Sequence, residues 1–295
     1  MNFNPQALSL ALAATCAGSV LAAVLGLTTA GASPEAPAQA AAAKTAEKQA
    51  LDANAAELVR AFAKRNITLD LAGGLCAIPA NVLIRDDLLE YLLVNGRGAA
   101  HESMLVTDVV PSQLNLALLT LGAKPGTNAT WAKKDPAPTL EEMKNGESAY
   151  EVRPPAGDGF YLYAAWKSGG ETYLYRIEDL LLDRSTGQTM KRHKWVYLGS
   201  RMVQAGDDKS QESFAADLEG NIVNIALFEQ GNTLITGALV ECLKQTVWQT
   251  NFWLVPPRDS SVLLVFARER LVALPKEWDA RIPEVAVEAP AKDGK

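Results

Sequence analysis

The stretch GFYLYAAWKSGGETYLYRI, residues 159–177, predicts a β-hairpin. Aromatic residues and leucine dominate both of its halves, and these side chains favour the pleated surface of a strand. The link KSGG at residues 167–170 is polar and ends in two glycines, a composition that turns a chain back on itself. We therefore expect antiparallel strands at 159–166 and 171–177 within a β-rich body.

Further runs with the character of strands lie on both sides of this hairpin. Each alternates apolar and polar residues or is short and apolar. They cover residues 67–71, 88–94, 102–110, 194–198, 214–218, 222–228, 235–239, 248–255 and 262–267. Because we find no internal repeat, we expect one β-dominated α+β domain over residues 67–277, with a few short helices.

The helices expected inside this domain are brief. Residues 111–121 carry apolar side chains at helical spacing, namely Leu114, Ala117, Leu118 and Leu121. The run begins with a proline, which suits a first helical turn, and Gly122 suits the position after its end. A second helix is predicted at 140–144, inside a polar surface excursion at 128–159.

The N-terminal segment, residues 1–32, has the character of a signal peptide or a membrane anchor. It holds no charged side chain, and residues 7–27 form an apolar run long enough to span about 30 Å of hydrocarbon. Small residues at 30–32 and 38–40 fit a cleavage site, but the usual basic residue before the apolar core is missing. Cleavage and anchoring both stay open, and Cys16 is expected to serve as a small apolar residue.

Three segments flank the domain. Residues 33–43 are rich in Ala and Pro and are expected to form a tether. Residues 44–66 are expected to form an amphipathic helix that docks on the domain through one apolar stripe. The stripe consists of Leu51, Ala55, Leu58 and Phe62. Residues 278–295, rich in Pro, Glu, Ala and Lys, are expected to be a disordered tail.

Composition and motifs exclude several classes of function. The chain has 28 Lys and Arg against 34 Asp and Glu, so it lacks the broad basic surface that nucleic-acid binding requires. Three cysteines and two histidines are too few for a cysteine-ligated iron–sulfur cluster. The sequence has no P-loop, Cys-x-x-Cys pair or nucleophile elbow. We expect no cofactor apart from a divalent metal held by residues that are distant in sequence.

The first candidate site is the loop at His101 and Glu102, just before the predicted helix. A neutral imidazole and a carboxylate can ligate a metal or act as acid and base, with Asp108 as a further ligand. In the alternative, His101 and Glu102 satisfy backbone groups of the loop, and Asp108 or Thr107 caps the helix that begins near Pro111.

The second candidate is His193, within the basic run 191–194 and next to Trp195. Beside an aromatic ring, this run can contact a phosphate or a lipid head group. The alternative is a solvated hairpin end whose charges keep a strand edge from pairing with other molecules.

Cysteine and tryptophan also leave alternatives open. Cys76 and Cys242 can form one disulfide in an exported protein, or they can stay as buried free thiols. Six tryptophans suggest a carbohydrate site or an aromatic cage, but most of them fall in strand-like runs and are expected to pack in the core.

Several blocks of the chain resemble proteins of the YdjY-domain family. The first blocks are LLEYLLV (88–94), Gly98, HES (101–103), TDVVP (107–111) and ALLTLGAKPG (117–126). Two weaker blocks are WVYLGS (195–200) and AADLEGN (215–221). The resemblance covers about residues 66–267 and implies an exported bacterial protein of the type common in planctomycetes. Some members carry a ferredoxin-like label, which this chain does not fit because it lacks the four ligands of a cluster.

Three functional hypotheses follow. The first is a non-catalytic domain, exported to the periplasm or anchored in the membrane through residues 1–32, that binds a small ligand or a partner at the cell envelope. The second is a metal-assisted hydrolase that uses His101 and Glu102 and needs His193, Asp108 or Asp217 close to them. The third is a structural protein of envelope assembly.

Overall fold

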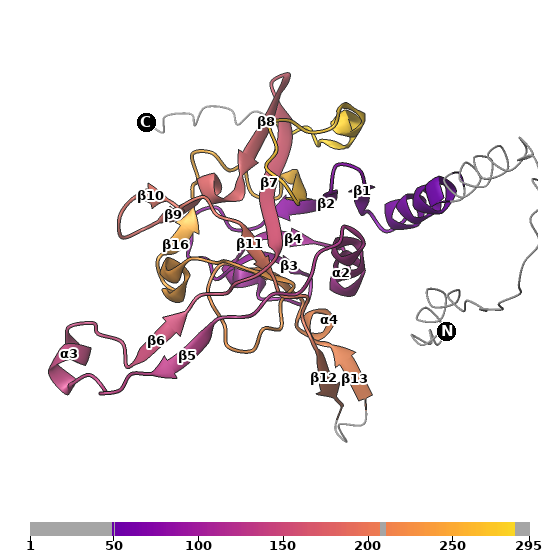
Figure 1. The fold of residues 1–295 in the computed structure, drawn as a ribbon. Helices are drawn as coiled ribbons and strands as arrows, with labels where there is room; N and C mark the ends of the chain where they lie inside the picture. The colour runs from indigo at the N-terminus through magenta and orange to yellow at the C-terminus, as the bar shows by residue number, and fades with distance from the viewer. Residues whose placement is uncertain (1–48, 50, 207–210, 287–295) are drawn as a thin grey trace, which may run out of the picture. The chain divides into compact units, whose positions relative to one another are not determined.

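The structure is a computed structural model that describes residues 49, 51–206 and 211–286 (Figure 1). The chain divides into two units, Met1–Ala50 and Leu51–Lys295, and all elements described below belong to the second. The predicted signal or anchor and the tether lie outside the described residues. In the described part of the chain, no helix combines the length and the apolar character that a membrane crossing needs.

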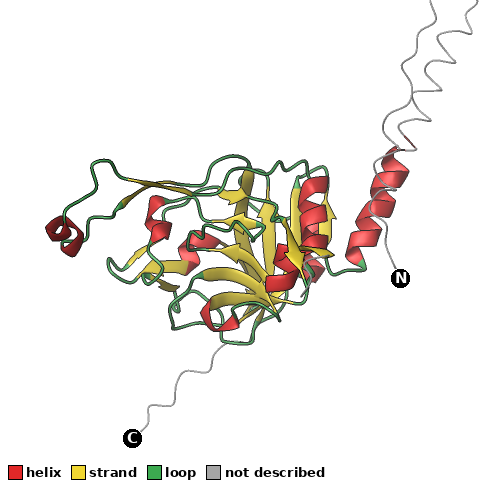
Figure 2. Cartoon of the chain, turned by 90° about the horizontal axis from the view of Figure 1, so that it is seen from below, coloured by secondary structure: helices red, strands yellow, loops and turns green. Residues whose placement is uncertain are grey.

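The body of the second unit is a sheet that closes on itself (Figures 1 and 2). Going around it, each strand is hydrogen-bonded to the next, in the order β2 (Leu75–Val82), β17 (Ser261–Ala267), β7 (Gly159–Ser168), β11 (Trp195–Tyr197), β15 (Ile235–Thr236), β14 (Asn221–Asn224), β3 (Tyr91–Asn95) and β4 (Ser103–Thr107). Strand β4 pairs back with β2 and closes the ring. Strands β1 (Thr68–Asp70) and β8 (Glu171–Arg176) pair with β2 and β7. The expected β-dominated domain is confirmed.

The hairpin predicted at residues 159–177 is formed by β7 and β8, and its turn depends on two glycines. Ser168 pairs with Glu171, so Gly169 and Gly170 alone make the turn, with φ of 59° and 83°. Side chains disfavour this left-handed region, and two such residues in succession are typical of the turn that matches the twist of the flanking strands.

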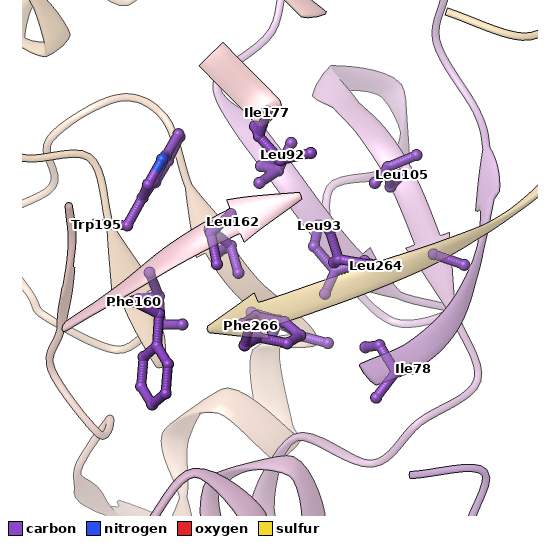
Figure 3. Close-up of a cluster of buried hydrophobic side chains, with 14 of the residues drawn as sticks. Ile78, Leu92, Leu93, Leu105, Phe160, Leu162, Ile177, Trp195, Leu264 and Phe266 are labelled. Carbon is purple, nitrogen blue, oxygen red and sulfur yellow. The ribbon is translucent and has the colours of Figure 1, made fainter. Parts of the chain in front are cut away.

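The main core fills the inside of the closed sheet. Phe160 and Leu162 of β7 meet Phe266 of β17 there, together with residues of β3 and β4 (Figure 3). The ring of Phe160 packs edge-on against Tyr197 and Phe266, with centroids 6.0 and 6.4 Å apart. These residues alternate with others that point out of the ring, as the period of a strand requires.

A second core lies on the outer face of β2, β7 and β17. Tyr163, Leu263 and their neighbours are covered there by Trp278 and Ile282, which are 3% and 8% exposed. Trp278 belongs to the 3₁₀ helix η5 (Lys276–Arg281). The predicted disordered tail is therefore wrong for residues 278–286, because two apolar side chains within a polar sequence complete an apolar face. Residues 287–295 lie outside the described residues.

The helices agree with the predictions in part. Helices α2 (Pro111–Thr120) and α3 (Leu140–Lys144) form where they were predicted. Residues 214–218 were predicted as a strand, but helix α4 (Ala215–Glu219) forms there and ends at Gly220, whose φ is 76°. Its small residues Ala215 and Ala216 are fully buried. Tertiary packing therefore stabilises a helix here, although the local sequence has the character of a strand.

The helix over residues 51–63 docks through a different face from the one predicted. Phe62 is 1% exposed and Val59 packs against the core, but Leu51 and Leu58 are 61% and 38% exposed. The predicted stripe is therefore correct only at its C-terminal end, where the helix leads into β1.

Two hairpins extend from the closed sheet. The larger one, β5 (Thr130–Lys133) and β6 (Tyr150–Arg153), carries α3 beyond its strands and projects away from the body in both views (Figures 1 and 2). The other consists of β12 (Met202–Ala205) and β13 (Gln211–Phe214).

The remaining elements lie beside the closed sheet. A small sheet contains β9 (Leu181–Asp183), β10 (Gln188–Thr189) and β16 (Trp248–Thr250). Short 3₁₀ helices are η2 (Ala100–Glu102), η3 (Ile177–Leu180) and η4 (Val240–Leu243).

Candidate functional site

The first predicted site, His101 and Glu102, lies on the surface in η2. The imidazole is 79% exposed, and its Nε2 lies 3.6 Å from Oε1 of Glu102. Burial, together with the neighbouring carboxyl of Glu102, raises the pKa of Glu90. The pair thus contacts another acidic side chain and no further histidine.

Asp108 takes no part in this cluster and does not cap α2. It is exposed, and the residue at the cap position of α2, Val110, offers no side-chain acceptor. Thr107 donates to the carbonyl of Pro79 at 2.7 Å. The backbone N–H of Ser112 instead donates to Oδ1 of Asp217 at 2.8 Å, so the expectation of a cap from Asp108 or Thr107 is wrong. Asp217, a residue of α4 that is distant in sequence, accepts this N–H at the start of α2 in their place.

The ligand set of the hydrolase hypothesis does not converge. His193 contacts Glu178 of η3, whereas His101 contacts Glu102, and Asp217 is engaged at the start of α2. Among the described residues, no three His, Cys, Asp or Glu side chains come together in a way that could hold a metal ion.

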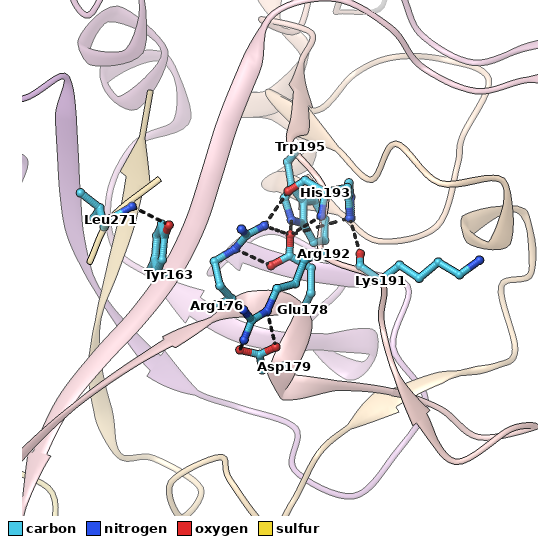
Figure 4. A network of polar contacts seen from close by, with 9 residues as sticks. All are labelled: Tyr163, Arg176, Glu178, Asp179, Lys191, Arg192, His193, Trp195 and Leu271. Carbon is cyan, nitrogen blue, oxygen red and sulfur yellow. Dashed lines mark hydrogen bonds and ion pairs between the residues drawn. The ribbon is translucent and has the colours of Figure 1, made fainter. Parts of the chain in front are cut away.

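His193 belongs to a buried polar network around Glu178 (Figure 4). The carboxylate of Glu178 is fully buried and accepts from Nε of Arg176 at 2.9 Å and from Nε1 of Trp195 at 3.2 Å. It also accepts the backbone N–H of His193 at 3.1 Å. The His193 ring stacks on Trp195 at 5.0 Å and is only 9% exposed, so the predicted solvated hairpin end is wrong at this residue.

The Lys and Arg side chains of the basic run 191–194 each have an acidic partner. Lys191 pairs with Glu241, the guanidinium of Arg192 makes a two-point contact with Asp179, and Lys194 lies 3.6 Å from Asp158. Because every cation already has a carboxylate partner, the structure does not favour this run as a site for a phosphate or a lipid head group.

The two cysteines of the domain are free and buried, so of the two alternatives left open by the sequence the buried free thiols are confirmed and the Cys76–Cys242 disulfide is not formed. Cys76 lies on β2 between β1 and β17, while Cys242 lies in η4 and its Sγ packs against Gly237. Burial raises the pKa of both thiols, that of Cys242 to about 12. Both are therefore core residues.

A cavity that the sequence predictions missed lies beside β3, in contact with the loop of residues 228–233. Its volume is about 220 Å³, and we call it the Tyr91 cavity. The residues that line it include Tyr91, Asn128, Glu219, Asn221, Phe228 and Asn232. The rings of Tyr91 and Phe228 are stacked, with centroids 5.2 Å apart, and form an aromatic wall.

Hydrogen bonds hold the polar wall of the Tyr91 cavity in place. The amide of Asn232 donates to Oε1 of Glu219 and accepts from Nε of Arg201 at 2.7 Å. Asn128 donates to the carbonyl of Phe228 at 2.7 Å and so fixes the start of the loop. The cavity is therefore organised before any ligand enters.

The charge that lines this cavity is negative. Among the described residues that line it, Glu219 is the only charged one, and none is Lys, Arg or His. Burial, followed by the charges of Glu90, Glu102 and Glu219, raises the pKa of Tyr91 to about 12. The phenol therefore stays protonated at neutral pH and can donate a hydrogen bond.

The sequence carried a weak signal of this site. Glu219 and Asn221 lie in a segment interpreted as a turn, and FEQGNT (228–233) has the composition of an ordinary loop. Only the pairing of β3 with β14, which sets Tyr91 opposite Asn224, brings Tyr91 to the cavity that these residues line.

Comparison with protein-family models finds the YdjY domain over residues 79–265. No significant match to the chain was found among curated proteins, and none among solved structures.

Proposed function

The chain belongs to the YdjY-domain family, and from this premise we propose that it is an exported or membrane-tethered envelope protein whose domain binds a small polar ligand in the Tyr91 cavity. The observation that carries the proposal is the combination of an aromatic wall, several amides and one carboxylate around one partly open cavity. This is the usual chemistry of a small-molecule site, where apolar contact supplies affinity and a few polar groups set orientation.

The volume and the charge of the Tyr91 cavity restrict the class of ligand that it can bind. A volume of about 220 Å³ is below the range typical of drug-sized ligands, so the cavity suits a molecule of about one ring. A carboxylate or phosphate on the ligand would meet Glu219 without a cation to balance it. The ligand we propose is therefore a neutral polyol or a small amine, whose positive charge would face Glu219 and Tyr91.

The cellular location is supported by the sequence. Residues 7–27 are apolar and uncharged, as in an export signal or an anchor, and the family resemblance implies export. Fractionation of cells that make the full chain tests this point, and its recovery from the cytoplasm with an intact N-terminus would contradict it.

A titration tests the binding site. The full chain in detergent is titrated calorimetrically with glucosamine, choline, glucose and citrate as probes, beside a Glu219→Gln variant. We expect an amine probe to bind and to lose about tenfold or more in affinity in the variant, because a charge-assisted contact is removed. Citrate should not bind.

A matched control is Glu229→Gln, since Glu229 lies next to Phe228 in the same loop but does not line the cavity. Its affinity for the probes should equal that of the parent. Binding of citrate, or equal losses in both variants, would speak against the Tyr91 cavity as the site.

A further inference from the structure

Trp253 differs from the other tryptophans of the domain in its exposure. Its side chain is 79% exposed, whereas Trp166, Trp195, Trp248 and Trp278 are at most 5% exposed. The expectation that most tryptophans are core residues is therefore confirmed, since these four are buried and the partly buried Trp131 packs against the core, and Trp253 is the exception. Tryptophan is enriched at binding interfaces, because its large ring buries much apolar area when a partner covers it.

The loop that carries Trp253 is held rigidly. Arg85, just after β2, donates from Nε to the carbonyl of Val255 at 3.2 Å and from Nη2 to that of Phe252 at 3.1 Å. Asn251, on the other side, donates to the carbonyl of Asp179 at 3.0 Å. The ring of Phe252 supports that of Trp253, with centroids 4.3 Å apart and a tilt of 35°. The indole is thus presented in a prepared position.

A groove of about 670 Å³ is lined on one side by Phe252, the residue whose ring contacts Trp253. Its apolar part is formed by Leu83, Ile84, Phe252 and Pro257, and the rest by Arg85, Asp86, Asp87 and Arg258. Two cations and two carboxylates leave the groove without net charge. It therefore offers both hydrogen-bond donors and acceptors beside a flat aromatic face.

This balance disfavours two other occupants. An anionic membrane surface attracts an excess of basic residues, which the groove does not have. A stable protein interface buries about 800 Å² on each side around an apolar centre. Among the described residues that form the groove and its loop, Phe252 and Trp253 are the only exposed large hydrophobic side chains.

We propose that Trp253, Phe252 and the adjoining groove form a binding platform for a neutral glycan chain. The C–H face of one sugar ring packs on the indole, and the hydroxyls of the next rings bond to the carboxylates and the Arg258 guanidinium. The volume lies within the range of ligand sites and accommodates more than one sugar. The platform is separate from the Tyr91 cavity, because the two share no lining residue.

The test uses the full chain in detergent with cellotetraose and tetra-N-acetylchitotetraose as probes, measured by calorimetry. We expect saturable binding of at least one tetrasaccharide and a loss of about tenfold or more in Trp253→Ala. Trp253→Phe should retain part of the affinity because it keeps an aromatic face. The control Val272→Ala, at a side chain that is 100% exposed, should bind as the parent does.

Several outcomes would overturn the proposal. These are the absence of saturable binding by both tetrasaccharides, or equal affinity in the parent and in Trp253→Ala. Loss of binding to anionic phosphatidylglycerol vesicles in Trp253→Ala, without any glycan binding, would instead assign the surface to a membrane. If Trp253→Ala fails to fold, Arg258→Gln gives the same comparison, and retained amine binding at the Tyr91 cavity shows that the chain is intact.

Discussion

The carboxylate of Asp217 accepts the backbone N–H of Ser112 at 2.8 Å, and so a residue of α4 caps the start of α2. The residue at the cap position of α2, Val110, has no side chain that can accept this bond. Helix N-termini leave several N–H groups without partners, and an acidic acceptor there also interacts favourably with the helix dipole. The contact therefore joins two short helices that lie far apart in the sequence.

Asp217→Ala should lower the free energy of unfolding by about 1 kcal/mol, because it removes this cap. Urea denaturation followed by circular dichroism measures the change. Asp108→Ala is the control, since Asp108 is exposed and caps nothing, and it should change the stability by less than about 0.5 kcal/mol. A larger loss in Asp108→Ala than in Asp217→Ala would contradict the assignment.

Glu178→Ala should be far more destabilising, by about 3–5 kcal/mol, because it leaves the buried Arg176 guanidinium without its partner. The control is Glu241→Ala, which breaks the ion pair with the largely exposed Lys191 and should cost less than about 1 kcal/mol. Both values come from urea denaturation at neutral pH. Similar losses in the two variants would mean that the network around Glu178 contributes no more than a surface ion pair.

His193 should make the fold sensitive to mild acid. Burial lowers the pKa of its imidazole below the ordinary 6.5, and the nearby Arg176 adds to this, against the opposing effect of Glu178. As the pH falls, His193 is therefore protonated in the unfolded chain at a higher pH than in the folded chain. The contribution of His193 to the free energy of unfolding is present above about pH 6.5 and is lost as the pH falls below that value. The melting temperature of the parent should decrease between about pH 7 and pH 5.5 more steeply than that of His193→Gln.

His101→Gln provides the matched comparison, since the His101 imidazole is 79% exposed. Its pH profile should follow that of the parent. If His193→Gln retains the full slope, another group causes the acid sensitivity.

The thiols of Cys76 and Cys242 should not react with a thiol reagent while the domain is folded. Both are buried, and burial raises the pKa of each, so little thiolate is present or accessible. In a Cys16→Ser background, two thiols should react after unfolding without reductant and none before. Detection of no free thiols in the unfolded, unreduced chain would instead indicate a disulfide.

The parts of the fold that were predicted correctly depend on local rules. The hairpin of β7 and β8 follows from Gly169 and Gly170, because glycine is among the few residues that favour the positive φ of that turn. Helix α3 follows from Thr139, whose side chain and that of Glu142 bond reciprocally at the helix start. These signals act between residues a few positions apart.

The incorrect predictions share a different cause. Strand β2 was missed because Pro79 interrupts its pattern, although the strand is central and pairs with β17 from Leu75 to Asn81. Trp278 and Ile282 lie in a polar sequence, yet they cover the outer face of the sheet. The burial of His193 within a basic run could not be predicted either, since its partner Glu178 belongs to another element.

The sequence by itself determined the family, the β-rich class, the hairpin and the short helices, since each depends on turn chemistry, periodicity or a contiguous motif. Only the tertiary structure decided which distant groups meet, including the Asp217 carboxylate with the backbone N–H of Ser112 and the ring of Tyr91 with that of Phe228. The tertiary structure also decided that the side chain of Trp253 is exposed to solvent. The physical reason is that a closed sheet brings together residues more than a hundred positions apart, and no local pattern encodes that pairing.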